Sequence, residues 1–218
     1  MKYRAEKIIH KRPIPSDTNC TLCSCYLKKN DIDKYLSDTI LFESNNFFVV
    51  PQYHCIIPGY ILLSSKRHVT STASLSQTEF EELKYVIEGI MSFITQRFGL
   101  TPIMFEHGSS DSNTIGTTHH HIHFLPTIFP NTNEIIDEYG LRALEKFDDL
   151  RTCDTKNDYL FLQNNKGKIY FAENRNTKML RTLIGKQLGN PDIFCEPLQT
   201  YEENIRKTVK MWGNLVLL

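Results

Sequence analysis

The sequence predicts an α+β fold with an antiparallel sheet, a long amphipathic helix and a C-terminal α/β extension. Two apolar runs flank an Asn-Asn pair within 40–52, which is the pattern of a β-hairpin, and another strand is expected over 60–66. A helix follows, and two more strands are expected at 101–108 and 119–127. This alternation of strand pairs with one helix is typical of an α+β sheet.

The predicted helix begins after Ser76 and ends before Gly99. Ser76 and Glu79 have the spacing of a capping box, and glycine is common just beyond the end of a helix. Apolar residues recur at helical spacing at Phe80, Leu83, Ile87, Ile90, Met91, Ile94 and Phe98. We interpret this stripe as the face that packs against the sheet.

The overall charge is balanced. Among 218 residues, Lys plus Arg and Asp plus Glu each number 25, so no excess charge favours an extended nucleic-acid surface or an anionic membrane. The N-terminal residues do not resemble a signal peptide, and no run of about 18 apolar residues is present. We therefore expect a soluble cytoplasmic protein in which any phosphate site is local.

The chain is expected to divide into a core over 1–127 and an extension over 128–218 that packs on it. The extension is predicted to hold a hairpin at about 158–173 and helices at about 176–188 and 201–212, the last opened by a Thr200/Glu203 capping box.

Histidines are concentrated before the end of the core. Five of the eight lie between 107 and 123. On a strand, His119, His121 and His123 would share one face, because successive side chains alternate. A neutral imidazole can attack phosphorus near pH 7, and the phosphoramidate that forms can be hydrolysed. A metal-binding face and a solvated histidine-rich strand remain alternatives.

The string HHHIHFL resembles the His-φ-His-φ-His-φ-φ signature of the histidine triad (HIT) superfamily, with His120 in place of the first apolar residue. The stretch IIPGYILLSSKRHV (56–69), the amphipathic helix and FEHG (105–108) follow in the order found in that family, so the resemblance covers about 18–127. FEHG is similar to a branch that includes diadenosine-polyphosphate-hydrolase-like and CwfJ-like proteins. The resemblance implies a HIT-like fold.

The resemblance implies a hydrolase for small nucleotides. His121 would attack an α-phosphate and form a covalent nucleotidyl intermediate, and His123 would contact the scissile phosphate and support proton transfer. Dinucleoside polyphosphates or nucleoside phosphoramidates are the expected substrates. Glu106 and His107 would lie near the nucleophile, either touching substrate or acting as structural partners of the loop. The alternatives are a nucleotidyltransferase of the same superfamily and a non-catalytic nucleotide-binding module.

Two positions depart from the pattern of this family. Many HIT proteins have an Asp that holds ribose about six residues before the proline that corresponds to Pro58, and this chain has Gln52 there. Where relatives often have a histidine after Pro-Gly, this chain has Tyr60. The first departure changes the residue expected to hold ribose, and the second removes a histidine that can orient the triad.

Cys20 and Cys23 form a C-x-x-C pair. This spacing fits a zinc site, a redox pair or two ordinary thiols. In zinc-binding HIT proteins the remaining ligands match His68 and His119 here, so the resemblance implies a closed, structural zinc site. Cys25 is a nearby competitor for either thiolate position.

The basic side chains of Lys178 and Arg181 could bind substrate phosphate, or form a solvated helix face. Trp212 and the apolar end 215–218 suggest a docking or dimer contact. HIT proteins are commonly homodimers, and this tail could alter that.

Overall fold

The computed structural model describes residues 20–30, 35–108, 119–129, 131–153, 158–173, 178–190, 192 and 198–213, without the side chains of 178–182 and 198. An antiparallel sheet of eight strands runs through these residues in the order β1-β2-β3-β5-β4-β7-β8-β6. The strands are β1 (Phe42–Glu43), β2 (Phe47–Pro51), β3 (Ile61–Ser65), β4 (Ile103–Gly108), β5 (His121–Leu125), β6 (Arg142–Leu144), β7 (Tyr159–Gln163) and β8 (Ile169–Glu173). The predicted α+β class is confirmed.

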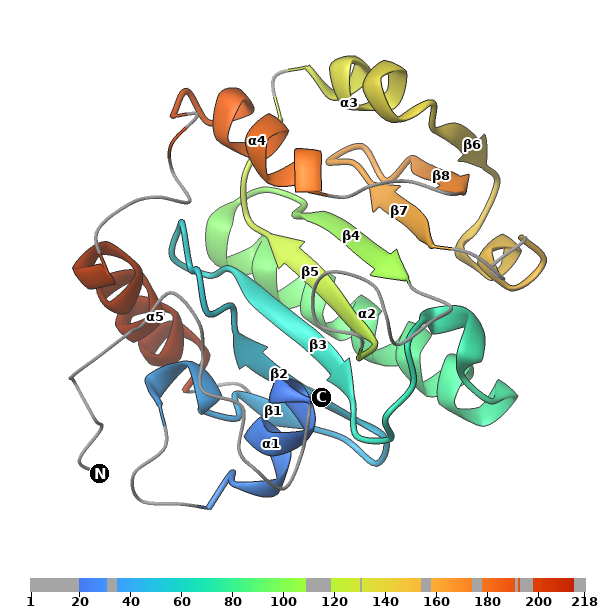
Figure 1. Ribbon diagram of the computed structural model, residues 1–218. Coiled ribbons are helices and arrows are strands. Elements are labelled where there is room, and N and C mark those ends of the chain that lie inside the picture. Colours follow the sequence, from blue (N-terminus) through green and yellow to red (C-terminus); the bar gives the residue numbers. More distant parts are fainter. Residues whose placement is uncertain are drawn as a thin grey trace.

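Five α-helices and three short 3-10 turns surround this sheet in the described part of the chain. The helices are α1 (Thr21–Leu27), α2 (Gln77–Phe98), α3 (Thr132–Tyr139), α4 (Lys178–Gln187) and α5 (Leu198–Trp212), and the turns are η1 (Leu36–Asp38), η2 (Thr72–Ser74) and η3 (Phe147–Arg151). Figure 1 shows α2 behind the strands, α5 at the left of the view and α1 near the bottom. No helix in the described ranges is both long and apolar enough to cross a membrane.

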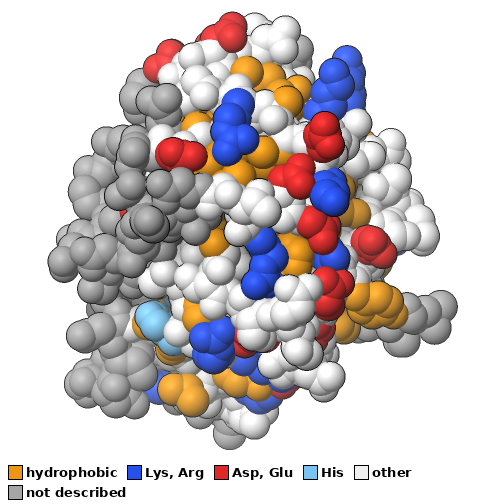
Figure 2. All heavy atoms as spheres, turned by 90° about the vertical axis from the view of Figure 1, so that its right-hand side faces the viewer, with side chains coloured by type: hydrophobic (Ala, Val, Ile, Leu, Met, Phe, Trp, Pro, Cys, Tyr) orange, Lys and Arg blue, Asp and Glu red, His pale blue; other side chains and the backbone are white. Residues whose placement is uncertain are grey.

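The predicted hairpins are present. Strands β1 and β2 pair antiparallel across the Asn-Asn turn, and β7 and β8 pair with Tyr159 opposite Glu173. Alternation along each strand sends apolar side chains to both faces, because the sheet is covered on both sides. Apart from Glu79 and Glu106, the charged side chains of the described residues are not buried. On the face in Figure 2, blue and red side chains are interspersed, as the balanced composition leads one to expect.

Helix α2 covers one face of the sheet. The Ser76 side chain accepts a hydrogen bond from the Glu79 amide, and the Glu79 carboxylate accepts one from the Ser76 amide, which is the predicted capping box. The helix ends at Gly99, whose φ of 69° is left-handed. Its apolar stripe packs on β3, β4 and β5, so the interpretation of the stripe as core is confirmed.

The C-terminal segment continues the sheet of the core. Strand β7 pairs with β4, with Phe105 opposite Leu162, so β6 to β8 extend the sheet that contains the histidine strand. Trp212 is fully buried and its ring centroid lies 4.4 Å from that of Phe93 on α2. The indole therefore docks within this chain, and residues 215–218 lie outside the described residues.

One predicted helix start is wrong. Helix α5 begins at Leu198, so Thr200 lies inside the first turn and does not cap the helix. The capping-box spacing was misleading because Ser and Thr at exposed positions of a first turn give the same sequence pattern as a true cap.

Candidate active site and Cys/His cluster

Strand β5 carries the histidines between two neighbours that fix its position. It pairs with β3 and β4, and Ser64 lies opposite His121. Just before the strand, the His120 amide donates to the carbonyl of Val69 at 2.6 Å, and the Ser64 hydroxyl donates to the carbonyl of His120 at 2.9 Å. The strand therefore starts at a defined residue, and its two faces are fixed with it.

His121 has a defined tautomer. Its Nδ1 lies 2.6 Å from the carbonyl oxygen of His119, and because a carbonyl can only accept, Nδ1 carries the proton. Burial lowers the pKa of His121, the hydrogen bond to the His119 carbonyl opposes this effect, and His107 lowers the pKa further. The ring is therefore neutral at pH 7 with its lone pair on Nε2, which is the state that a nucleophilic imidazole requires.

His123 is held from two sides. Its Nδ1 lies 2.8 Å from the hydroxyl oxygen of Tyr60, and its ring stacks on Phe105 with centroids 4.4 Å apart and planes 7° from parallel. The rings of His121 and His123 lie side by side, with centroids 4.9 Å apart. Two imidazoles with independently fixed orientations thus share one partly exposed face of β5.

His107 belongs to this face as well. Phe105 lies opposite His123 in the pairing of β4 with β5. His107 is two residues further along β4 and therefore lies beside His121. Burial lowers the pKa of His107, and Asp158, whose carboxylate lies 4.0 Å away, opposes the effect. His107 therefore lies on the same face of the sheet as His121.

Glu106 lies on the other face of the sheet. Its carboxylate is fully buried and accepts hydrogen bonds from the Thr72 amide at 2.7 Å and the Tyr159 hydroxyl at 2.9 Å. His120, also buried, lies 4.0 Å away and bonds the Thr72 hydroxyl at 3.1 Å. The structure therefore does not bring Glu106 to the triad, and its position fits the alternative of a structural partner, here of the segment that contains η2.

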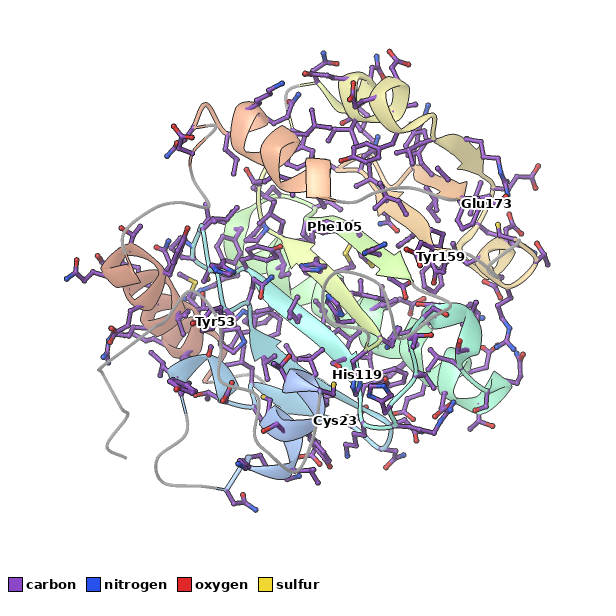
Figure 3. The ribbon with its side chains drawn as sticks, in the orientation of Figure 1. Cys23, Tyr53, Phe105, His119, Tyr159 and Glu173 are labelled. Atoms are coloured by element: carbon purple, nitrogen blue, oxygen red, sulfur yellow. The ribbon has the colours of Figure 1, made fainter. Side chains whose placement is uncertain are left out.

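A Cys/His cluster, formed by Cys20, Cys23, His68 and His119, lies at the start of β5. One ligand atom from each residue falls within 4.8 Å of the others. The Sγ atoms of Cys20 and Cys23 each lie 3.3 Å from Nδ1 of His119, and Sγ of Cys23 lies 3.3 Å from Nδ1 of His68. Figure 3 shows Cys23 of α1 close to His119. The four residues expected to meet are brought together, and the cluster could hold a metal ion.

The chemistry of the donors fits a cation. Nε2 of His119 donates to the Ser65 carbonyl at 2.7 Å, which leaves Nδ1 unprotonated and directed to the thiols. Burial raises the pKa of Cys23 to about 12, with a further contribution from Cys20, and burial lowers the pKa of His119 to about 4. The Cys23 thiol, which resists ionisation by itself, would ionise readily beside a divalent cation.

The segment that supplies His68 is anchored to α2. The neighbouring guanidinium of Arg67 donates to both carboxylate oxygens of Glu79, at 2.8 and 2.6 Å. Arg67 lowers the pKa of Glu79 to about 2, and the same carboxylate completes the capping box. Glu79 therefore fixes both the start of α2 and, through Arg67, the segment that carries His68.

Other expected residues lie elsewhere or cannot be placed. The buried Cys25 directs its thiol to the carbonyl of Asp38 at 3.9 Å and is not part of the cluster. Gln52 is 9% exposed and its amide oxygen accepts from the Tyr53 amide. The side chains of Lys178 and Arg181 lie outside the described residues, so their contact with substrate stays a prediction.

Sequence reasoning missed Phe105, Ser65, Thr72 and Tyr159. Phe105 could have been found from strand alternation, which puts it on the face of His107. The other three are ordinary residues whose roles depend on contacts far along the chain.

Glu106 should give the protein a characteristic loss of stability at higher pH. Burial raises its pKa to about 7, against an ordinary 4.5, despite the hydrogen bonds from Thr72 and Tyr159. The folded state therefore binds this proton more tightly, and the stabilisation present below pH 4.5 is lost as pH rises through 7. The free energy of unfolding of the wild type, measured with denaturant, should fall between pH 5 and pH 8. In Glu106→Gln this fall should be smaller by about 3 kcal/mol.

Glu88, an exposed glutamate on α2, provides the control. The free energy of unfolding of Glu88→Gln should depend on pH as that of the wild type does. Equal pH dependence for Glu106→Gln and wild type would contradict the burial of an ionisable carboxyl at this position.

Some known proteins are similar to this chain in sequence or in structure. No family model matches the chain. It is 29% identical over 104 residues to bis(5'-adenosyl)-triphosphatase of Dictyostelium discoideum, a match that covers 45% of this chain and 68% of that protein. A hypothetical histidine triad nucleotide-binding protein from Sulfolobus tokodaii is 18% identical, with a TM-score of 0.40 over 50% of this chain and 68% of that one. Yeast Ap4A phosphorylase in complex with AMP is 13% identical, with a TM-score of 0.39 over 77% of each chain. In its triad strand and in its sequence similarity to the triphosphatase, the chain resembles proteins of the histidine triad superfamily.

Proposed function

We propose that this protein hydrolyses small nucleotides at the α-phosphate through a covalent intermediate on His121. The observation that carries the proposal is the hydrogen bond from Nδ1 of His121 to the His119 carbonyl, because it leaves the lone pair on Nε2 of a neutral ring. The similarity to an enzyme named for cleaving bis(5'-adenosyl) triphosphate supports the same class of reaction.

In the first step, the lone pair on Nε2 of His121 attacks phosphorus and the bond from phosphorus to the leaving group breaks. The leaving oxygen or nitrogen keeps that bonding pair and takes up a proton. His121 becomes positively charged as the new P–N bond forms, and the His119 carbonyl stabilises the proton on Nδ1.

In the second step, a water molecule attacks the same phosphorus and the P–N bond breaks, which returns the lone pair to Nε2. The water loses a proton as the nucleoside monophosphate forms. His123 supports both proton movements because its ring lies beside His121, with Tyr60 and Phe105 holding its orientation.

The substrates that fit this site are dinucleoside polyphosphates and nucleoside phosphoramidates. Gln52, at the position where relatives hold ribose with Asp, is largely buried and turns its amide oxygen to its own neighbour. We therefore infer that recognition depends chiefly on the phosphates, with His107 as one contact beside the nucleophile. A homodimer and a cytoplasmic location remain predictions from the resemblance and the sequence.

Changing His121 to Ala should abolish turnover, with a loss of at least about 10³-fold in the rate of nucleotide release from diadenosine triphosphate. Rapid acid-free quenching and mass spectrometry of the wild type should find one nucleotidyl group on the peptide that contains His121. Glu88→Gln, at an exposed position on α2, should retain both turnover and adduct.

Undiminished hydrolysis by His121→Ala would contradict the mechanism. Adding inorganic phosphate separates hydrolysis from transfer. A monophosphate product that is insensitive to phosphate supports the hydrolase, whereas a new diphosphate product would show the transferase. Tight binding without turnover across a panel of such nucleotides would show a binding module instead.

The Cys/His cluster is proposed to hold one structural zinc ion. Two sulfur and two nitrogen donors suit a closed tetrahedral site, and the second nitrogen of His119 is already held by the Ser65 carbonyl. Zinc bound there would neutralise the thiolates and tie α1 to the start of β5. Its contribution would be to fix His119, whose carbonyl orients His121.

Purified protein should contain about one equivalent of zinc, and Cys23→Ser should reduce it to less than about half, with a lower Tm because metal binding is coupled to folding. Cys25→Ser is the matched control, since its thiol lies outside the cluster, and it should keep the metal. Metal analysis by mass spectrometry checks both. A wild-type content below half an equivalent that Cys23→Ser does not change would remove this proposal.

A further inference from the structure

Helix α5 packs against the loop that leads into β3. Three residues on one face of the helix, Tyr201, Asn204 and Thr208, contact this loop at three places, as residues spaced three and four apart on a helix can. The Tyr201 ring lies 5.5 Å from the ring of His54. In Figure 3, Tyr53 lies toward α5 at the same junction.

Thr208 provides the most buried of these contacts. Its hydroxyl accepts a hydrogen bond from the Gly59 amide at 2.8 Å and donates one to the Asn204 carbonyl at 2.8 Å, and its side chain is fully buried. The thiol of Cys55 lies 3.5 Å away. A buried amide such as that of Gly59 is costly to leave without a partner, so the loop depends on this hydroxyl.

The loop has little freedom to adjust around this contact. Gly59 has a φ of 90°, which favours glycine, and a Cβ placed there would lie 2.4 Å from Cζ of Phe98. The amide of the Asn204 side chain donates to the Cys55 carbonyl at 2.8 Å, which fixes a second point four residues earlier. The backbone that precedes Tyr60 is therefore held at two points by one helix.

Tyr60 follows directly, and its hydroxyl lies 2.8 Å from Nδ1 of His123. If the hydroxyl donates, the proton of His123 must sit on Nε2, where it can be given to a phosphoryl oxygen or a leaving group. A small displacement of the Tyr60 backbone would lengthen this bond and let the second imidazole change tautomer.

We propose that Thr208 is a positioning residue, and that α5 acts through it to hold Tyr60 on His123. The C-terminal helix is thereby part of the proposed site although it lies far from it in sequence. The effect on turnover rests on the proposed function, but the effect on the state of His123 does not, so the two can be tested separately.

The test compares variants by ¹⁵N NMR of histidine-labelled, substrate-free protein. Thr208→Val keeps the shape of the side chain and removes its hydroxyl. The ¹⁵N chemical shifts of the His123 ring should therefore change toward the values that they have in Tyr60→Phe. Thr208→Ser should keep the wild-type values because the hydroxyl remains. Met211→Leu, which changes the packing of the same helix against the hydrophobic cluster that contains α2, should leave the ¹⁵N chemical shifts of His123 unchanged.

A double-mutant cycle shows whether the effect passes through Tyr60. Thr208→Val should change the ¹⁵N chemical shifts of His123 when Tyr60 is present. It should cause no further change in protein that already carries Tyr60→Phe. Where the enzyme turns over, kcat should fall roughly 10-fold in Thr208→Val with KM nearly unchanged, and Thr208→Ser should restore it. Lack of wild-type turnover would contradict the proposed function, while the NMR measurement would still decide the role of Thr208.

Asn204→Ala provides a second variant if Thr208→Val does not fold, because it releases the other end of the loop and should shift His123 in the same direction. His123 resonances that stay at wild-type values in the folded Thr208→Val or Asn204→Ala proteins would overturn the proposal. An equal shift by Thr208→Val with and without the Tyr60 hydroxyl would overturn it as well.

Discussion

The hydrogen bond between Nδ1 of His121 and the carbonyl of His119 is the interaction on which the site depends. It selects one tautomer of one imidazole, and the donor and the acceptor are two residues apart on the same strand. Anything that moves the His119 backbone therefore changes the direction of the His121 lone pair. The Cys/His cluster holds the His119 ring, and the Val69 carbonyl holds the next amide, so the segment is restrained on both sides.

The two faces of β5 have different tasks. On one face, His121 and His123 meet His107, Phe105 and Tyr60, and the rings remain partly exposed as a substrate site requires. On the other, His120 and Ile122 are buried, with Glu106 and Thr72 close to His120. A buried carboxyl and a buried imidazole cost stability through desolvation, and their hydrogen bonds to the η2 segment offset part of that cost. These hydrogen bonds give that segment a defined position beneath β5.

The sequence was sufficient for the features that have local patterns. The hairpins, the capping box of α2 and the alternation of the histidines depend on neighbouring residues, and the structure confirms them. The Cys20–Cys23 pair was locally visible, whereas His68 and His119 required the resemblance, because a C-x-x-C pair alone does not specify its partners.

Features that depend on distant contacts could not be predicted in this way. Nothing around Thr208 indicates that it would bond the Gly59 amide, 149 residues away. Trp212 looked available for docking because an aromatic residue near an apolar tail has no local partner, yet it fills a gap beside Phe93. The resemblance implied that both Glu106 and His107 lie near the nucleophile, but adjacent strand residues point to opposite faces. The same rule, applied to β4, would have favoured Phe105 and His107.

The central claim is that the nucleophilic nitrogen of His121 is prepared before substrate arrives. ¹⁵N NMR of the substrate-free protein, with the His121 signals assigned through a His121→Gln sample, measures this directly. The structure predicts a protonated Nδ1 and an unprotonated Nε2 at pH 7, with the ring still neutral somewhat below the ordinary histidine pKa. A ring protonated on Nε2, or on both nitrogens at pH 7, would contradict it.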